Sequence, residues 1–180
     1  MLQQPLLQDM SQDYVPTRED AGRTVYFDMD GTIADLYGVK PKVTNYSQGK
    51  ELNVFQRLDA NDADVYKEAA PIPQFITMMH QFKEMGYRIG IITAGSRFSP
   101  NTPQDIKDKM NIETEKAKRE WIQQQGLSSI VDTFQFVPYG VSKYEVAEDK
   151  AGILVDDEDK VLNTWFSDRI KAVNRNKAIH

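Results

Sequence analysis

Two carboxylates lie two residues apart, directly after an apolar run. Asp28 and Asp30 follow residues 25–27, Val-Tyr-Phe, and Gly31 comes next. A buried strand carries its last residues to the sheet edge where open α/β sheets hold ligands, so both acids are expected at one site. Gly31 permits the backbone turn that directs the two side chains toward one point. Because paired hard oxygen donors on one loop suit Mg²⁺, the pattern predicts a magnesium site.

The segment from Asp28 to Thr32 reads Asp-Met-Asp-Gly-Thr and follows a hydrophobic strand. Asp-x-Asp-Gly-Thr in this setting resembles the first motif of the haloacid dehalogenase (HAD) superfamily. The resemblance continues over residues 24–160, where three later positions have the order and character of the remaining motifs of the family. It implies a HAD fold and the chemistry of that superfamily.

By this resemblance, Asp28 is the catalytic nucleophile that attacks a phosphoryl group and forms an aspartyl-phosphate. Asp30 is the general acid for the leaving oxygen and then the base that activates water. The haloacid dehalogenases within the superfamily lack an acid at this position, so Asp30 favours phosphoryl transfer. Asp35 resembles a further acid of some nucleotidase members, or it caps a helix, and both interpretations stay open.

The second motif is a hydroxyl residue after a buried strand, and residues 91–96 resemble it. Thr93 ends the apolar run, and Ala94 and Gly95 follow it. The resemblance implies that the Thr93 hydroxyl and the following backbone N–H groups bind phosphoryl oxygens, as helix N-termini and nests do. Thr93, Ala94 and Gly95 are therefore expected to bind substrate.

The lysine of the third motif has two candidates. Lys143 opens a predicted helix after Ser142, in the interval where this motif usually lies, and could neutralise the charge of Asp28 and the phosphate. Lys118 and Trp121 form a Lys-x-x-Trp pattern similar to that of deoxyribonucleotidase relatives. Lys143 is preferred as the substrate-binding lysine, and Lys118 remains the alternative.

Two adjacent acids, Asp156 and Asp157, end the predicted strand 153–155 and resemble the acidic metal motif of the family. The resemblance favours Asp157 as a Mg²⁺ ligand, together with the Asp28 carboxylate and the Asp30 backbone carbonyl. Asp156 would then orient the lysine or a metal-bound water, although either acid could bind the metal. Mg²⁺ is the expected cofactor.

Bulk composition narrows the class of protein. The 180 residues are 40% hydrophobic and 27% charged, as in a soluble globular domain. A net charge of −5 argues against stable binding to nucleic acid or to an anionic membrane. The chain has no cysteine and no apolar run near the ~18 residues of a membrane span. A cytoplasmic protein with a small phosphorylated substrate is expected, while its oligomeric state is not predicted.

Apolar runs alternate with helical stripes, which indicates a three-layer, Rossmann-like α/β fold with a central parallel sheet. Strands are expected at 24–27, 87–93, 134–137 and 153–155, and a last short one at 170–173. Thr102 and Ser142 are expected to cap helices. The stripe from 104 to 126 fits one helix, or two that break near Asn111.

Three segments are expected. Residues 1–22 form an N-terminal arm, residues 23–35 and 71–180 form the HAD core domain, and residues 36–70 form a small helical cap inserted after the first strand. The interval 36–70 is far longer than a usual βα loop of about 2–6 residues, which is why a cap is predicted.

The cap must select the substrate. Its aromatic residues could stack a nucleobase or could pack the cap onto the core, and they are Tyr37, Tyr46, Phe55 and Tyr66. Chain length, cap position, the Pro-Ile-Pro at 71–73 and the Lys-x-x-Trp pattern resemble the 5′(3′)-deoxyribonucleotidase branch, which implies a (deoxy)nucleoside monophosphate as substrate. The alternatives are a polynucleotide 3′-phosphatase, another small-metabolite phosphatase, and a catalytically silent HAD-like binding module.

Overall fold

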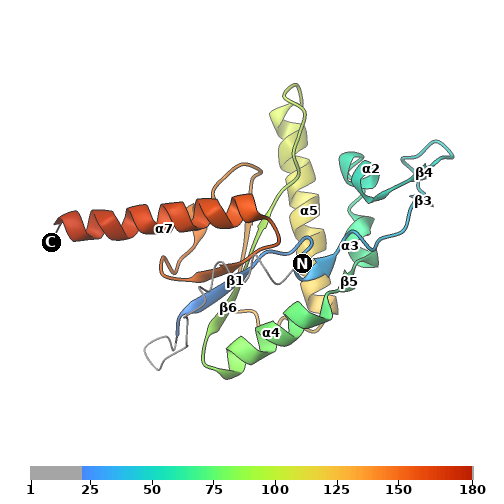
Figure 1. The fold of residues 1–180 in the computed structure, drawn as a ribbon. Coiled ribbons are helices and arrows are strands. Elements are labelled where there is room, and N and C mark those ends of the chain that lie inside the picture. The colour runs from blue at the N-terminus through green and yellow to red at the C-terminus, as the bar shows by residue number, and fades with distance from the viewer. Residues whose placement is uncertain (1–21, 180) are drawn as a thin grey trace.

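Four parallel strands form the centre of the protein. The computed structural model describes residues 22–179, and side chains up to residue 172. The strands are β1 (Thr24–Phe27), β6 (Arg88–Ala94), β7 (Thr133–Val137) and β8 (Ile153–Val155), in the order β7-β6-β1-β8. Helices flank this sheet, which confirms the predicted three-layer, Rossmann-like α/β fold (Figure 1).

The strand β1 is buried along its whole length because it has a neighbour on each side. Phe27 pairs with Ile91 of β6 and with Val155 of β8, both in parallel register. The N–H of Asp28 extends this ladder by donating to the carbonyl of Val155 at 2.8 Å. Asp28 therefore leaves the sheet at its carboxyl edge, between two neighbouring strands.

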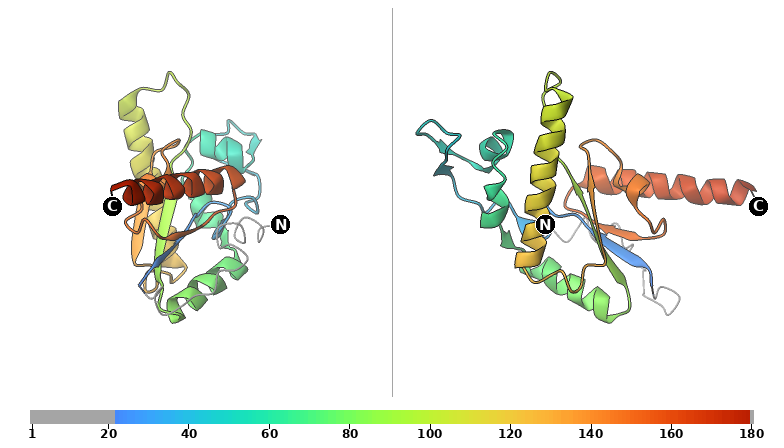
Figure 2. Two further views of the ribbon diagram at one scale, coloured as in Figure 1. Left: turned by 60° about the vertical axis from the view of Figure 1, so that its left-hand side comes forward. Right: turned by 180° about the vertical axis from the view of Figure 1, so that it is seen from behind.

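Side chains of β1 alternate between the two faces of the sheet, and each face has its own helices. Val25 and Phe27 pack on the side of α4 (Pro73–Glu84) and α5 (Gln104–Gln124), in one cluster with Met79 and Trp121. The two helices lie together on this face (Figure 2). Apolar residues at helical spacing thus became the buried faces of α4 and α5.

The opposite face carries α6 (Lys143–Val146) and α7 (Asp159–Ile179). Tyr26 points to this side and contacts Trp165 of α7, with ring centroids 5.7 Å apart. Tyr144 of α6 packs edge-on against the same indole at 5.2 Å. This second core fixes α6 and α7 over the strands that end near Asp28.

Residues 36–70, which we call the insertion, follow one short strand and end at the first residue of a second strand that pairs with it. β2 (Ala34–Asp35) and β5 (Ala70–Pro71) are antiparallel. The insertion contains the hairpin β3 (Lys42–Val43) and β4 (Glu51–Leu52), followed by α2 (Val54–Asp59) and α3 (Asp64–Glu68). It stands beside α5 (Figure 1).

The strand predicted at 170–173 is wrong, because α7 continues through it as one helix to Ile179. The run was interpreted as a strand from its β-branched and apolar residues, yet Ile170 is largely exposed on the helix. In contrast, α5 has no break at Asn111 and forms one helix. None of the helices in residues 22–179 combines the length and apolar character needed to cross a bilayer.

Neither predicted helix cap forms. α5 begins after Pro103, and no side chain caps it. Ser142 precedes α6 as expected, but its hydroxyl donates to Asp168 of α7 at 2.7 Å and not to the backbone of α6. A hydrogen bond to a distant helix therefore replaces the expected hydrogen bond to the backbone of α6. The predicted N-terminal arm falls almost wholly on residues 1–21, which lie outside the described residues.

A buried arginine organises the insertion. The Arg57 side chain is 0% exposed, and its Nε donates to Asp62 at 2.8 Å. A second nitrogen of Arg57 pairs with Glu68, and this hydrogen bond lowers the pKa of the Glu68 carboxyl. Arg57 thus ties α2 to α3, and the Tyr66 hydroxyl of α3 contacts Asp30.

Arg57→Ala is expected to lower the free energy of unfolding by about 3 kcal/mol, because it leaves the Asp62 and Glu68 carboxylates without their buried cationic partner. Urea denaturation followed by circular dichroism measures this loss. Lys67→Ala, which removes an exposed partner of Asp64 on the same helix, is the control and should leave stability unchanged. Equal stability of the two variants would contradict the role assigned to Arg57.

Candidate active site

The loop after β1 is a tight turn that brings two acids to the carboxyl edge. The Met29 carbonyl accepts hydrogen bonds from the N–H groups of Thr32, Ile33 and Ala34. Gly31 has φ +79°, and a Cβ built there would overlap the Asp157 carboxylate. The glycine is therefore needed both for its backbone conformation and for the approach of Asp157.

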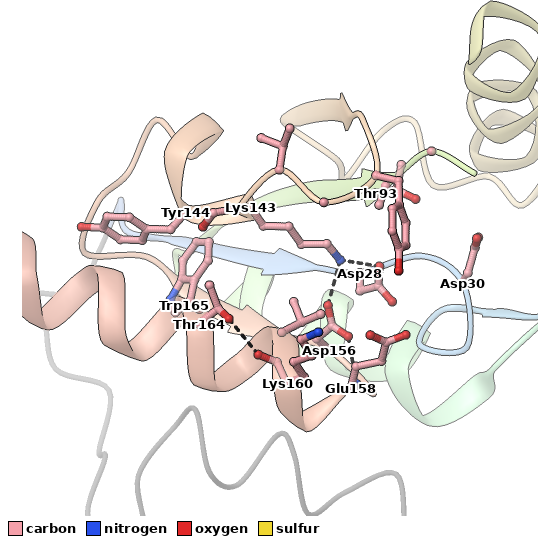
Figure 3. Close-up of a pocket in the computed structure, with 17 residues that line it drawn as sticks. Asp28, Asp30, Thr93, Lys143, Tyr144, Asp156, Glu158, Lys160, Thr164 and Trp165 are labelled. Carbon is pink, nitrogen blue, oxygen red and sulfur yellow. Dashed lines mark hydrogen bonds and ion pairs between the residues drawn. The ribbon is translucent and has the colours of Figure 1, made fainter. Parts of the chain in front are cut away.

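Asp28 is buried, and its carboxylate accepts from Lys143 and from Thr32. The Lys143 Nζ lies 2.6 Å from one oxygen, and the Thr32 hydroxyl donates to the other at 3.3 Å. Lys143 also donates to Asp156 at 2.8 Å, so one ammonium pairs with two carboxylates (Figure 3). Burial lowers the pKa of Lys143, but the charges of Asp28 and Asp156 outweigh it and raise the pKa above its ordinary value. This lysine stays protonated.

Asp30 lies apart from the pair of Asp28 and Lys143, on the side of α5 and the insertion (Figure 3). Its Oδ2 accepts from Lys118 at 3.2 Å and from the Tyr66 hydroxyl at 3.4 Å, whereas its Oδ1 is buried without a partner. Burial raises the pKa of Asp30; the Lys118 charge opposes this shift and the Asp28 charge adds to it. A carboxyl in this environment holds a proton more readily than an exposed one.

Both candidate lysines reach the site, from opposite sides. Lys118 is 0% exposed on α5, and its Nζ donates to the Thr93 hydroxyl at 2.6 Å and to the Ala94 carbonyl at 2.9 Å. Lys143 contacts Asp28, while Lys118 contacts Asp30 and Thr93. The two alternatives of the sequence are therefore two separate cations of one site.

The carboxyl end of β6 and the turn after it differ in detail from the expectation. Thr93, Ala94 and Gly95 all line the cavity at Asp28. However, the Gly95 N–H donates to the Val137 carbonyl at 2.7 Å, which extends the pairing of β6 with β7. That N–H is engaged in the sheet, so the Thr93 hydroxyl is the group of this turn best placed for a phosphoryl oxygen.

Three carboxylates form a group that could hold a cation. Asp28, Asp156 and Asp157 each offer an oxygen, and these atoms lie within 4.8 Å of one another. Asp156 already accepts from Lys143 and from the Glu158 N–H at 3.0 Å, so both of its oxygens have donors. Asp157 accepts from the Thr32 hydroxyl at 3.4 Å and lies beside Asp28. The all-oxygen set fits Mg²⁺, with Asp157 freer than Asp156 to bind it.

The raised pKa values of the acids in this group also favour a bound cation. Burial and the Asp28 charge raise the pKa of Asp156 to about 7, despite the opposing charge of Lys143. Burial, Asp28 and Asp156 raise the pKa of Asp157 to about 8. Ionising these acids costs free energy in the folded protein, and a bound divalent cation would remove that cost.

Two cavities open at the acids. The larger, of about 460 Å³, is lined by Asp28, Asp30 and Thr93 and extends to α7 (Figure 3). The smaller, of about 180 Å³, lies between Asp30 and the insertion and is lined by Phe55 and Tyr66. Asp30 lines both cavities, so it could donate a proton to a molecule bound in either of them.

The remaining sequence candidates are placed as follows. Asp35 accepts from the Gly38 N–H at 3.0 Å and stabilises that turn. Tyr37 and Phe55 contact each other at 5.8 Å on the surface, and Tyr46 is exposed. Tyr66 alone of these aromatics is buried against Asp30.

Sequence reasoning assigned no site role to Thr32, although it belongs to the first motif. Its hydroxyl lies between Asp28 and Asp157, at 3.3 and 3.4 Å. The hydroxyl side chain next to the motif glycine was the available signal. The role of Tyr66 depends on how the insertion docks, which sequence spacing does not determine.

No protein-family model and no curated protein matches this sequence. One solved structure with a similar chain is described as "Structure of Pnkp1/Rnl/Hen1 complex". The TM-score is 0.48 and the identity 11%, over 86% of this chain and 46% of that chain. This chain thus spans less than half of the one it matches.

Because the pKa values of Asp156 and Asp157 are raised, the free energy of unfolding without a divalent cation should fall as pH rises. Their unfolded pKa is about 4, so ionisation costs the folded state free energy between about pH 4 and pH 8. We expect MgCl₂ to raise the melting temperature more at about pH 8 than at about pH 6, because Mg²⁺ binds the ionised acids. Differential scanning fluorimetry against EDTA measures the shift.

Asp157→Asn should abolish this Mg²⁺-dependent shift, because it removes the carboxylate that is freest to bind the ion. Glu84→Gln, at an exposed acid near the end of α4, should retain the shift and serves as the control. A shift of the same size in both variants would mean that Mg²⁺ binds elsewhere.

Proposed function

We propose that this protein is a Mg²⁺-dependent phosphomonoesterase that works through an aspartyl-phosphate at Asp28. The observation that carries the proposal is the pairing of Asp28 with Lys143 at 2.6 Å, at the edge where Asp30, Asp157 and Thr93 also meet. A nucleophile, an acid, lysine cations and a cation-binding group at one edge of the sheet are the parts that phosphoryl transfer requires. The resemblance of the sequence to the HAD superfamily agrees with this assignment.

In the first step, a carboxylate oxygen of Asp28 attacks phosphorus and the bond from phosphorus to the ester oxygen breaks. Asp30 donates its proton to the departing oxygen, so an alcohol leaves and the phosphoryl group stays on Asp28. Burial raises the pKa of Asp30 above its ordinary value, which favours the protonated form that the acid role needs.

In the second step, a water attacks the phosphorus of the acyl phosphate. Asp30, now ionised, accepts the proton of that water, the bond from phosphorus to Asp28 breaks, and inorganic phosphate is released. Lys118, at 3.2 Å from Asp30, favours the ionised form reached after the first step. Burial therefore favours the acid form of Asp30, and Lys118 favours the base form that follows it.

The two lysines have different tasks in this proposal. Lys143 holds Asp28 in place and offsets negative charge on the phosphoryl group during transfer. Lys118 orients the Thr93 hydroxyl, at 2.6 Å, toward the phosphoryl oxygens. Mg²⁺ held by Asp28, Asp157 and the Asp30 carbonyl would supply further positive charge to the phosphoryl oxygens.

A (deoxy)nucleoside monophosphate is the proposed substrate. The larger cavity, of about 460 Å³, falls within the range of about 300–1,000 Å³ of small-molecule sites and can take more than a phosphate ion. The sequence resemblance to the 5′(3′)-deoxyribonucleotidase branch supports the nucleotide. Hydrolysis of 3′-phosphorylated oligonucleotides in preference to nucleoside monophosphates would instead favour a polynucleotide 3′-phosphatase.

Asp28→Asn is expected to lower kcat for every phosphomonoester by about a thousandfold or more, because the amide cannot form the acyl phosphate. Release of inorganic phosphate from a panel of nucleotides and sugar phosphates measures it, with circular dichroism to verify folding. If the wild type turns over no member of the panel, the protein is a silent binding module and the proposal fails.

Asp30→Asn is expected to slow hydrolysis of a nucleoside monophosphate by about a hundredfold or more, because its alkoxide leaving group needs a proton. The loss should be much smaller with p-nitrophenyl phosphate, whose phenolate leaves unprotonated. The ratio of the two kcat values is the measurement. Asp59→Asn, at a carboxylate on the smaller cavity, should leave that ratio unchanged, and equal losses on both substrates would remove Asp30 as the acid.

A further inference from the structure

The larger cavity at Asp28 is built by the core domain and not by the insertion. Among the described residues, none of 36–70 lines it; its walls come from the loop 138–142, from α6 and from the first turns of α7. We call it the core-side cavity. The smaller cavity, which Phe55 and Leu58 line, is called the insertion-side cavity.

The mouth of the core-side cavity carries apolar side chains in contact with solvent. Tyr139 is 59% exposed and Val141 is 38% exposed, both on the loop that joins β7 to α6. The Arg97 guanidinium lies over the Tyr139 ring, 6.0 Å from its centroid, and so adds a cation beside the aromatic face. Exposed apolar groups at the rim of a cavity mark a binding surface.

The walls farther in combine apolar and polar groups. Val161 and Trp165 of α7 line the cavity together with Lys160 and Thr164 (Figure 3). Lys160 has no ion pair among the described residues, so its ammonium is a donor that no carboxylate occupies. A few donors on an apolar wall are typical of sites that bind small organic molecules.

Size also separates the two cavities. About 460 Å³ accommodates a nucleoside, whereas about 180 Å³ lies below the usual range of ligand sites of about 300 Å³ and more. Asp28 and Asp30 both line the core-side cavity. An ester that occupies this cavity therefore shares one space with both reactive carboxylates.

We propose that the ring-bearing leaving group of the substrate binds in the core-side cavity, with its ring against Tyr139, and not under the insertion. This inference rests on the proposed phosphomonoesterase function and specifies where that site selects its substrate. Selection then falls to the loop 138–142 and α7. The exposed aromatics of the insertion, Tyr37, Tyr46 and Phe55, have no part in it.

Tyr139→Ala and Phe55→Ala test the choice of cavity as a matched pair, because the two rings are 59% and 56% exposed and neither supports the core. The measurement is kcat/KM for a deoxyribonucleoside monophosphate and for glycerol phosphate, which has no ring. Tyr139→Ala should raise KM for the nucleotide by about tenfold with kcat preserved, since stacking on an aromatic side chain is lost.

The same variant should hydrolyse glycerol phosphate as the wild type does, and Phe55→Ala should match the wild type on both substrates. Tyr139→Phe, which keeps the ring, should restore nucleotide hydrolysis. A loss in Phe55→Ala with none in Tyr139→Ala would overturn the proposal, as would equal losses of Tyr139→Ala on both substrates, or no loss in either variant.

Binding separates failure of this inference from failure of the phosphatase function. Calorimetric titration of Asp28→Asn, and of the double variant with Tyr139→Ala, should give about tenfold weaker nucleotide binding in the double variant. Inorganic phosphate, as the probe without a ring, should bind both proteins equally. Equal nucleotide affinity of the two proteins would overturn the proposal even if phosphatase activity is established.

Discussion

Buried negative charge at the carboxyl edge of the sheet is the constraint on which the other features depend. Three carboxylates, those of Asp28, Asp156 and Asp157, share one small volume, and an unpaired ionised carboxylate in a protein interior costs several kcal/mol. Lys143 pairs with two of them, and for that it must extend from the start of α6 across the edge of the sheet. The packing of Tyr144 and Trp165 fixes α6 in that position. The hydrophobic core on this face therefore positions Lys143, whose charge offsets the cost of burying the carboxylates. The same carboxylates would supply the nucleophile and the metal ligands for phosphoryl transfer.

Much of this arrangement follows from the order of residues along the chain. The four parallel strands were predicted from apolar runs, and the carboxyl ends of parallel strands share one edge. The residues at the carboxyl ends of β1, β6 and β8 were therefore expected to converge, and Asp28, Thr93 and Asp156 do line one cavity. This success depends on local hydrophobicity and on a general property of parallel sheets. It requires no knowledge of how any helix is rotated.

Features that depend on packing between distant elements could not be obtained in that way. Spacing could not show that Lys118 and Lys143 both reach the acids, because this depends on which face α5 turns toward β6. Ser142 stands where a helix cap is expected, but its hydroxyl donates a hydrogen bond to Asp168, which is distant in the chain. The β-branched residues at 170–173 favour a strand locally, whereas the continuous hydrogen bonding of α7 overrides that preference.

The pairing of β2 with β5 has a consequence for how such a protein can change. β2 ends just before the insertion, and β5 begins at its last residue. Because the two strands pair with each other, the ends of the insertion are held together and the main sheet can keep its geometry when the segment between them changes. Closing a longer loop costs only about 0.6 kcal/mol for each doubling of its length. Segments of very different size could therefore replace residues 36–70 over evolutionary time without disturbing Asp28. Because Tyr66 contacts Asp30, such an exchange would nevertheless alter the surroundings of the acid as well as the outline of the molecule.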